Sequence, residues 1–396
     1  MIKWREIFNK IEKYIDSPEA IIITGMRRTG KTTVLNFFYE RLDSNNRLLL
    51  DLENPLNRKY FEETNYERIK ISLEFLGIDF TKKAYIFLDE IQLVKGLPSV
   101  VKYFIDHHQV KFFLTGSASF YLKNLFTESL AGRKYIFELF PLSFKEFLIF
   151  KDSALNIPER ADKITRPIFD TISPLYDEYI VFGGFPGVVL KNSADEKKMA
   201  LNEIFSSFFQ MEILQLGDFR RNEAIRDLIL LLIQRVGSKL DKQKLSKELG
   251  ISRQTLTEYI AFLESTYFIK LIRPLSRGTD TEIRKMPKVY ICDTGLGNQL
   301  ARLETGALFE NSVFQTLRMQ GEINYYAKKS GLEIDFIVDK KWAYEVKTMP
   351  QPSDLKKLNE MATSLNLEGS KIVSKNYTHL ENCTYGFMVE GASIPP

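Results

Sequence analysis

The sequence predicts an α/β protein that begins with a parallel sheet and ends in a second, smaller α/β domain. Three observations predict this. Over the first 150 residues, short apolar runs alternate with helical patterns, as in sheets that are covered by helices. From residue 222 the order changes to three helices and a hairpin, and from residue 307 helices and strands alternate again. We therefore expect four parts, at residues 1–150, 151–221, 222–285 and 286–396.

Five apolar runs in the first part predict strands. They are Ala20–Thr24, Leu48–Leu52, Tyr85–Asp89, Lys111–Thr115 and Tyr135–Leu139. The first four are almost continuously apolar, which is typical of parallel strands that are buried on both faces. The segment at residues 151–221 is mostly helical in pattern and is interrupted by the turn Phe182–Gly187, so we expect a helical lid or bridge there.

A glycine-rich loop joins the first predicted strand to the first predicted helix. Its residues 25–32 match G-x-x-x-x-G-K-[ST] at every fixed position. Together with the next residue they form the candidate ATP-binding set: Gly25, Met26, Arg27, Arg28, Thr29, Gly30, Lys31, Thr32 and Thr33. In such a loop the backbone N–H groups point inward around phosphates, and the helix that follows adds the positive end of its dipole. Lys31 is expected to reach the β- and γ-phosphates of ATP, and Thr32 to bind Mg²⁺. The loop therefore predicts a P-loop NTPase.

Two carboxylates lie at the end of the third predicted strand. Asp89 is suited to hold Mg²⁺, and Glu90 is suited to act as the general base that activates the attacking water. Ser117, or alternatively Thr115, is expected to place a polar side chain between this water and the γ-phosphate, but ordinary turn chemistry explains the same residues. Arg133 is a candidate arginine finger that acts on a neighbouring subunit's nucleotide in a homo-oligomer, with an ordinary surface arginine as the alternative. These residues predict an ATPase.

The part at residues 222–285 has the order of a winged helix, because a helix–turn–helix pattern is followed by a hairpin. Ser252 is a good N-cap for the third helix, which would be the recognition helix. Arg253, Gln254 and Thr257 are expected to face outward on this helix, and Arg277 lies in the predicted turn of the hairpin. These residues are candidate DNA contacts. The alternative is a winged helix that packs against the ATPase part without touching nucleic acid.

The last part, at residues 286–396, resembles the PD-(D/E)xK nuclease fold in its order of helix, three strands, helix and strand. Glu345 and Lys347 are two residues apart on one predicted strand and therefore share a face, and Asp335 lies on the strand before it. Glu310 matches the extra acid of many such sites. These side chains could bind a second Mg²⁺ for phosphodiester hydrolysis. Ile334 replaces the proline of the motif, and the alternative is an inherited fold used as a binding or assembly platform.

Taken together, these residues resemble the bacterial and archaeal AAA+-type ATPases that carry a carboxyl-terminal domain of unknown function. The resemblance covers essentially the whole chain. Its marks are residues 25–33, 87–92, 115–117, 130–133, 141–147 and 288–296. The resemblance implies nucleotide binding, Mg²⁺-dependent ATP hydrolysis and a DNA-linked or regulatory role. Met26 departs from the family pattern, in which proline is frequent, but its side chain is not expected to touch phosphate.

The composition says more about where the protein is located than about what it does. Lys and Arg total 55 against 51 Asp and Glu, and the net charge of +4 is too small to argue for a polyanionic partner. Two cysteines exclude a disulfide framework, and no uncharged run approaches the roughly 20 residues that cross a bilayer, so we expect a cytoplasmic protein without a membrane partner. The leading hypothesis is an ATP-driven switch or motor that acts with nucleic acid. The alternatives are an ATP-gated signalling or defence regulator with a protein partner, and an ATP-licensed, metal-dependent DNA nuclease.

Overall fold

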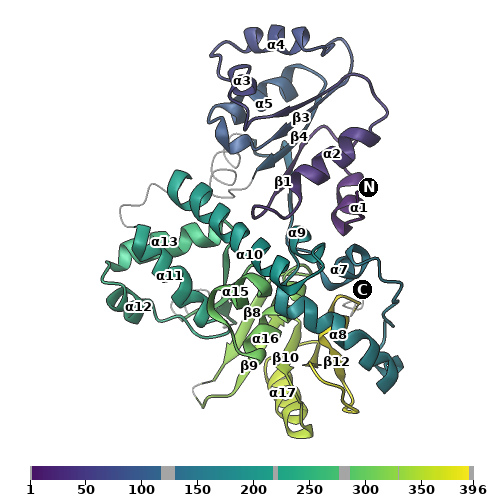
Figure 1. Ribbon diagram of the computed structural model, residues 1–396, viewed down its shortest axis with the longest axis vertical. Coiled ribbons are helices and arrows are strands. Elements are labelled where there is room, and N and C mark those ends of the chain that lie inside the picture. Colours follow the sequence, from purple (N-terminus) through teal and green to yellow (C-terminus); the bar gives the residue numbers. More distant parts are fainter. Residues whose placement is uncertain (1, 117–129, 217–221, 276–285, 329, 392–396) are drawn as a thin grey trace. The chain divides into compact units, whose positions relative to one another are not determined.

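The computed structural model describes residues 2–116, 130–216, 222–275, 286–328 and 330–391 (Figure 1). The predicted site residues Ser117 and Arg277 lie outside these ranges. The chain divides into two compact units, one of Met1–Phe140 with Ser265–Tyr267 and the other of Pro141–Glu264 with Phe268–Pro396. The finer division into four parts stays a prediction.

The first unit is a five-stranded sheet with helices on both faces. Its strands are β1 (Ala20–Thr24), β2 (Arg47–Asp51), β3 (Ala84–Asp89), β4 (Val110–Gly116) and β5 (Lys134–Glu138). Its helices are α1 (Glu6–Glu12), α2 (Lys31–Arg41), α3 (Pro55–Lys59), α4 (Tyr66–Phe75), the short 3-10 helix η1 (Ile91–Leu93) and α5 (Leu97–His107). Each strand lies within one residue of its predicted bounds, and every neighbouring pair is parallel, so the predicted parallel sheet is confirmed.

The strand order of this sheet is β2-β3-β4-β1-β5. β4 therefore lies between β1, which precedes the phosphate loop, and β3, which ends in Asp89. Because the carboxyl ends of parallel strands share one edge of a sheet, the phosphate loop, Asp89 and the end of β4 are brought to the same edge. In open α/β sheets this is the edge at which ligands bind.

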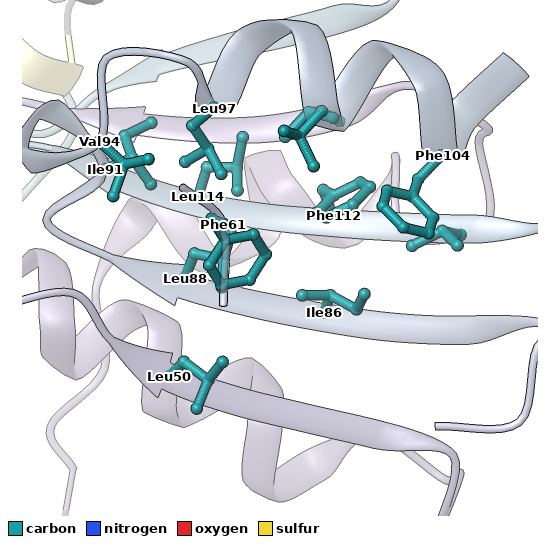
Figure 2. Packing of buried hydrophobic residues seen from close by; sticks show 14 of the residues in the cluster. Leu50, Phe61, Ile86, Leu88, Ile91, Val94, Leu97, Phe104, Phe112 and Leu114 are labelled. Carbon is teal, nitrogen blue, oxygen red and sulfur yellow. The ribbon is translucent and has the colours of Figure 1, made fainter. Parts of the chain in front are cut away.

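Alternate residues of the central strands enter two different cores, which explains why these strands are apolar throughout. On one face, Leu88 of β3 and Leu114 of β4 belong to a buried cluster with side chains of α5, and Leu97 of α5 lies beside Leu114 (Figure 2). On the other face, Phe87 and Phe113 pack with residues of α1 and α2. Burial of each large apolar side chain contributes about 1.5–3 kcal/mol. The strand ends that carry Asp89 and Thr115 are therefore held by packing on both faces.

Helices make up the first part of the second unit. They are α7 (Phe144–Phe150), η2 (Ala161–Lys163), α8 (Arg166–Phe182), α9 (Pro186–Val189), α10 (Ala194–Phe208), the π-helical segment η3 (Phe209–Leu216), α11 (Asn222–Gln234), α12 (Lys242–Glu248) and α13 (Arg253–Ser265). Further along the chain lie α15 (Thr294–Ala301), α16 (Thr305–Leu317), α17 (Pro352–Ser364) and η4 (Gly386–Gly391). Within the described ranges, no helix is both long enough and apolar enough to cross a bilayer.

A mixed seven-stranded sheet completes the second unit. Its strands are β6 (Ile269–Pro274), β7 (Lys288–Ile291), β8 (Ile323–Ala327), β9 (Glu333–Val338), β10 (Trp342–Lys347), β11 (Gly369–Ser374) and β12 (Cys383–Tyr385), in the order β12-β11-β10-β9-β8-β6-β7. The hairpin β6–β7 joins the later strands because β6 pairs in parallel with β8. The predicted boundary between residues 285 and 286 therefore falls between two paired strands of one sheet.

A buried carboxylate ties the turn after α8 to the start of α15. Asp293 accepts hydrogen bonds from the backbone N–H groups of Leu296 at 2.9 Å and Gly184 at 2.7 Å. A Cβ on Gly183 would lie 2.0 Å from the Asp293 carboxylate, so this turn requires glycine. Burial raises the pKa of Asp293 to about 6, against the opposing effect of its backbone donors. The glycine-rich turn after Phe182 thus serves to admit this carboxylate.

Candidate functional site

The phosphate loop connects β1 to α2 at the carboxyl edge of the first sheet. A Cβ on Gly25 would lie 2.2 Å from the carbonyl oxygen of Leu139, so the backbone approach excludes any larger residue. Gly30 is the N-cap of α2 and has a φ of 99°, a left-handed conformation that favours glycine. Backbone geometry therefore requires both fixed glycines of the motif.

The ammonium group of Lys31 lies against the backbone of the loop. Its Nζ donates to the carbonyl oxygen of Gly25 at 3.1 Å and to that of Met26 at 3.0 Å. The hydroxyl of Thr29 also donates to the carbonyl oxygen of Met26, at 2.8 Å. The Met26 side chain is buried, in agreement with the expectation that it does not face phosphate. These bonds hold the loop in a closed turn with its lysine folded back onto it.

Arg5, which no sequence motif indicates, braces the loop from outside. Its guanidinium donates to the carbonyl oxygen of Thr29 and to that of Phe140, both at 3.0 Å. Arg5 is itself buried. A buried guanidinium with two carbonyl partners fixes the loop relative to the end of β5. Its position 20 residues before the motif gives no local signal, so only the structure identifies it.

The Asp89 carboxylate receives hydroxyl groups from two other elements. Thr32 of α2 donates to its Oδ2 at 2.6 Å, and Thr115 of β4 donates to its Oδ1. Asp89 is only 6% exposed, and no lysine or arginine of the described residues forms an ion pair with it. The structure thus brings the two predicted Mg²⁺ ligands, Thr32 and Asp89, into direct contact. Thr115, the alternative to Ser117, lies beside them.

Glu90 lies immediately after Asp89 in a left-handed conformation, with a φ of 54°. This conformation is strained for a residue other than glycine, by about 1–3 kcal/mol. The Glu90 carboxylate accepts a hydrogen bond from the amide of Gln92, in the same turn. Gln92 falls within the family mark at residues 87–92, but no motif gives it a role. The carboxylate is partly exposed at the edge of the sheet, where a water molecule can reach it.

Arg133 lies at the opposite end of the sheet from the phosphate loop. It directly precedes β5, whose first residue is in register with Ala20 at the start of β1. Its guanidinium pairs with Asp106 at 2.6 Å, and its side chain is 38% exposed. Arg133 therefore cannot reach the phosphate loop of its own chain. The arginine-finger hypothesis concerns the nucleotide of a neighbouring chain, and it stays a prediction.

The predicted carboxyl-terminal residues also come together. The Asp335 carboxylate on β9 accepts the backbone N–H of Val346 at 2.9 Å, beside Glu345 on β10. Lys347 donates to the Glu345 carboxylate at 2.7 Å, as expected for two side chains on one face of a strand. The fourth residue, Glu310 of α16, joins this group through a lysine described next. The role of these residues stays a prediction.

Lys288 of β7 lies among three carboxylates. It is the first residue of the family mark at 288–296, but no motif gives it a role beside these acids. Its Nζ is in contact with Glu333, 3.5 Å from Asp335 and 3.6 Å from Glu310. The Lys288 side chain is 4% exposed. Tyr290, two residues later, donates its hydroxyl to Glu310 at 2.6 Å. The carboxylates are therefore bound by protein cations and a hydroxyl.

Two acids of this cluster, Glu310 and Glu345, resist ionisation. Burial and then the charge of Asp335 raise the pKa of Glu310 to about 7, and the same two causes raise the pKa of Glu345 to about 7. The second oxygen of Glu345 is buried without a hydrogen-bond partner. Within the described ranges, no group of three or more acidic, His or Cys side chains is arranged to hold a metal ion. As arranged, these residues do not fit the expected second Mg²⁺.

The candidate DNA contacts that the structure describes are exposed. Arg253, Gln254 and Thr257 lie on the outer face of α13, and Gln254 donates to Glu258 at 3.2 Å. Leu256 and the other apolar residues of this helix are buried, as the helical spacing predicts. The outward face is therefore available to a partner.

Comparison with protein families supports the ATPase-type fold of the first unit. The family described as "AAA domain" matches residues 17–148, and two families described as "domain of unknown function" (DUF8612 and DUF4143) match residues 173–307 and 305–389. The parallel sheet, the phosphate loop and the first match define a domain with the AAA-type P-loop ATPase fold. Domains of this fold generally bind ATP with Mg²⁺.

Two relatives extend the comparison to most of the chain. An uncharacterized protein of Methanocaldococcus jannaschii is 30% identical over 328 residues, which cover 80% of this chain and 71% of that protein. An uncharacterized protein of Haemophilus influenzae is 28% identical over 357 residues, or 86% and 84% of the two chains. The chain belongs to the same family as the M. jannaschii protein.

Solved structures resemble the chain more loosely. The ORC1 protein of Aeropyrum pernix, solved in complex with DNA, has a TM-score of 0.37 and 14% identity and covers 76% of this chain and 92% of its own. PH0952 of Pyrococcus horikoshii, a signal transduction ATPase with a tetratricopeptide repeat sensor, has a TM-score of 0.33 and 12% identity and covers 81% and 46%. TM-scores this low carry no argument about what this chain binds.

Proposed function

We propose that this protein hydrolyses ATP with Mg²⁺ and uses the nucleotide cycle to switch how its second unit engages nucleic acid. The observation that carries the ATPase part is the Asp89 carboxylate, which is bound by the hydroxyls of Thr32 and Thr115 beside the phosphate loop. Hydroxyl partners are neutral and leave the carboxylate charge available to a cation, and oxygen ligands are those that Mg²⁺ prefers. The residues present therefore fit the group that this fold generally binds.

Each residue of this site has a distinct role in the proposal. Lys31 and the backbone of the loop hold the phosphates, and Thr32 and Asp89 hold the metal ion. When bound, Mg²⁺ supplies charge neutralisation at the phosphates. Glu90 accepts the proton of the attacking water, and the amide of Gln92 orients the Glu90 carboxylate through the hydrogen bond between them.

The nucleic-acid part rests on the segment around α13. We propose that residues 222–285 form a winged helix, in which α11, α12 and α13 precede the hairpin that contains β6. The exposure of Arg253, Gln254 and Thr257 on one helix face supports base and phosphate contacts. Lys244 and Lys247 of α12 are also exposed and add positive charge. Phosphate contacts by such residues make binding depend strongly on salt.

The test is ATP turnover measured with and without duplex and single-stranded DNA, over a series of salt concentrations. We expect DNA to raise turnover, DNA affinity to fall with salt, and Arg253→Glu to weaken DNA binding. Arg160→Glu is the charge-matched control, because Arg160 is exposed and pairs only with its neighbour Asp162. Turnover that ignores DNA would instead favour an ATP-gated regulator with a protein partner. A purified protein without any ATP turnover would refute the proposal as a whole.

A second candidate is an ATP-licensed DNA nuclease with a PD-(D/E)xK-like fold at residues 286–396. The observation in its favour is the meeting of Asp335, Glu345 and Lys347 at one site. Because the site as arranged does not fit a metal ion, we assign no catalytic step to it. Mg²⁺-dependent cleavage of DNA that is lost in Asp335→Ala would support the candidate, and cleavage that persists in this variant would exclude the site.

A further inference from the structure

Three of four clustered carboxylates in the second unit meet a lysine from an earlier part of the chain. The acids are Glu310 on α16, Glu333 and Asp335 on β9, and Glu345 on β10. Two of the lysines that meet them, Lys239 and Lys288, lie before residue 292. The lysines fall within the family match at residues 173–307, whereas all four acids fall within the match at residues 305–389. The acidic group is therefore completed by side chains of a different module.

Lys288 is the central member of this arrangement. Its ammonium contacts Glu333 and lies 3.5 Å from Asp335 and 3.6 Å from Glu310. It also lies 5.7 Å from the centre of the Tyr325 ring, at a distance that favours a cation–π interaction. Lys239 also lies near this ring, 5.8 Å from its centre. It contributes differently because it is more exposed and its ion pair is with Glu333, at 2.7 Å. Lys288 is thus the cation that the carboxylates share.

We propose that Lys288 is a built-in counter-ion that takes the place of a divalent cation among Glu310, Glu333 and Asp335. The site is closed to Mg²⁺ and Mn²⁺ for as long as this side chain remains there. The proposal accounts for the mismatch between a donor set rich in carboxylates and an arrangement that does not suit a metal ion.

Two physical arguments support closure. To bind here, Mg²⁺ would need carboxylate oxygens within about 2.0–2.1 Å. Oxygens of Glu310, Glu333 and Asp335 already face the ammonium of Lys288. A metal ion that entered beside Lys288 would be repelled by it at short range, where little water is present to screen the two charges. Lys288 cannot simply turn into solvent, because it is buried within the sheet on β7. Removal of its charge is therefore the direct way to open the site.

The experiment measures Mn²⁺ binding to the full chain without nucleotide, from the electron paramagnetic resonance signal of the free ion. Lys288→Met keeps the length and the apolar stem of the side chain but removes the charge. We expect this variant to bind Mn²⁺ about tenfold or more tightly than the wild type. Thermal unfolding in the presence of Mn²⁺ gives a second readout, because the ion should stabilise the variant more than it stabilises the wild type.

Matched variants show whether a gain in Mn²⁺ affinity arises at the acids around Lys288. Lys239→Met removes a more exposed lysine whose ion pair is with Glu333. This variant is expected to bind Mn²⁺ as the wild type does. Adding Asp335→Asn to Lys288→Met should abolish the gain. Should Lys288→Met fail to fold, Lys288→Gln serves in its place, since it also removes the charge and retains a polar end.

Each outcome of the Mn²⁺ titration either supports or overturns the proposal. A gain in Lys288→Met that depends on Asp335 supports the proposal. Absence of a gain, or Asp335-dependent Mn²⁺ binding that is equally tight in the wild type, overturns it. The measurement does not involve ATP, so its result is independent of the function proposed for the phosphate-loop site.

Discussion

The protein contains two acidic sites whose carboxylates have opposite kinds of partner. In the first unit, Asp89 is bound by the hydroxyls of Thr32 and Thr115. In the second unit, Asp335 is close to the ammonium of Lys288, and its neighbour Glu345 is paired with Lys347. Both sites are largely buried. The difference lies in whether the protein itself supplies the positive charge.

This contrast teaches that a cluster of acids is not by itself a metal site. A hydroxyl donates a hydrogen bond without cancelling the charge of the carboxylate, so the Asp89 site retains a charge that a cation can neutralise. An ammonium cancels that charge and fills the space between the acids. Because isolated buried charges are costly, a buried carboxylate needs hydrogen-bond donors or a nearby cation, and the two sites meet this need differently. Hydroxyl partners, as at Asp89, suit a site that binds Mg²⁺. An ammonium partner, as at Asp335, suits a site that is closed to metal ions.

The largest expected effect is at Glu90. Glu90→Gln keeps the shape of the side chain but cannot accept a proton, so we expect ATP turnover to fall by about 10²–10⁴-fold while ATP binding persists. Asp51→Asn is the matched control, because Asp51 ends the neighbouring strand in register with Asp89 and receives only a turn hydrogen bond from Glu53. The control should keep turnover within about twofold of the wild type. Unchanged turnover in Glu90→Gln would remove Glu90 from the proposed role of base.

Lys31 gives the next largest effect, on binding. Lys31→Ala removes a charge-assisted contact to phosphate, and we expect ATP affinity to fall about 100-fold, or about 2.7 kcal/mol. Calorimetric titration with ATP measures this directly. Lys10→Ala, on the exposed side of α1, is the control and should bind ATP as the wild type does. If Lys31→Ala binds ATP normally, the phosphate loop is not the nucleotide site. The Asp89 site could then no longer be contrasted with the second acidic site as a site that binds Mg²⁺ with ATP.

The sequence predicts the first unit well because its signals are local. The phosphate loop, the apolar strands and the acids after β3 are each read from a few adjacent residues, and the five strands appear within one residue of their predicted bounds. The sharing of a face by Glu345 and Lys347 likewise follows from strand periodicity. Local patterns therefore place the candidate ligands without knowledge of the fold.

The partners of these residues could not be predicted in the same way. Arg5 acts on a loop more than 20 residues away, and Lys288 meets acids that lie up to 47 residues later in the chain. The parallel pairing of β6 with β8, which brings Lys288 near β9, is also non-local. No periodicity or motif connects such positions, since they are joined only by the packing of the whole unit. The sequence thus predicts which acids gather, and the structure is needed to show what neutralises them.

Asp293 is a third buried carboxylate and distinguishes structural from chemical roles. Asp293→Ala leaves the N–H groups of Gly184 and Leu296 without their acceptor, so we expect the free energy of unfolding to fall by about 1–3 kcal/mol. ATP affinity should not change. Urea unfolding measures the loss, and a variant as stable as the wild type would show that these hydrogen bonds contribute nothing net.

The loss of stability in Asp293→Ala is also expected to depend on pH. Burial raises the pKa of Asp293 from 3.8 to about 6, so the folded state favours the protonated carboxyl. The stability that comes from this preference is complete below about pH 4 and is lost as the pH rises through 6. The destabilisation caused by Asp293→Ala should therefore be larger at about pH 4.5 than at pH 7. A difference that grows with pH would show that the carboxylate is bound more strongly than the acid.

Arg133 gives the smallest expected effect. It lies at the far end of the sheet from the phosphate loop and is paired with Asp106, so Arg133→Ala should leave ATP affinity within about twofold of the wild type. Its only route to a nucleotide is through a second chain. Turnover per subunit should therefore be compared at high and low protein concentration: a finger predicts that turnover rises with concentration and that Arg133→Ala removes the rise. If turnover per subunit is the same at all concentrations, Arg133 is a surface residue, and the Asp89 site is completed by residues of one chain.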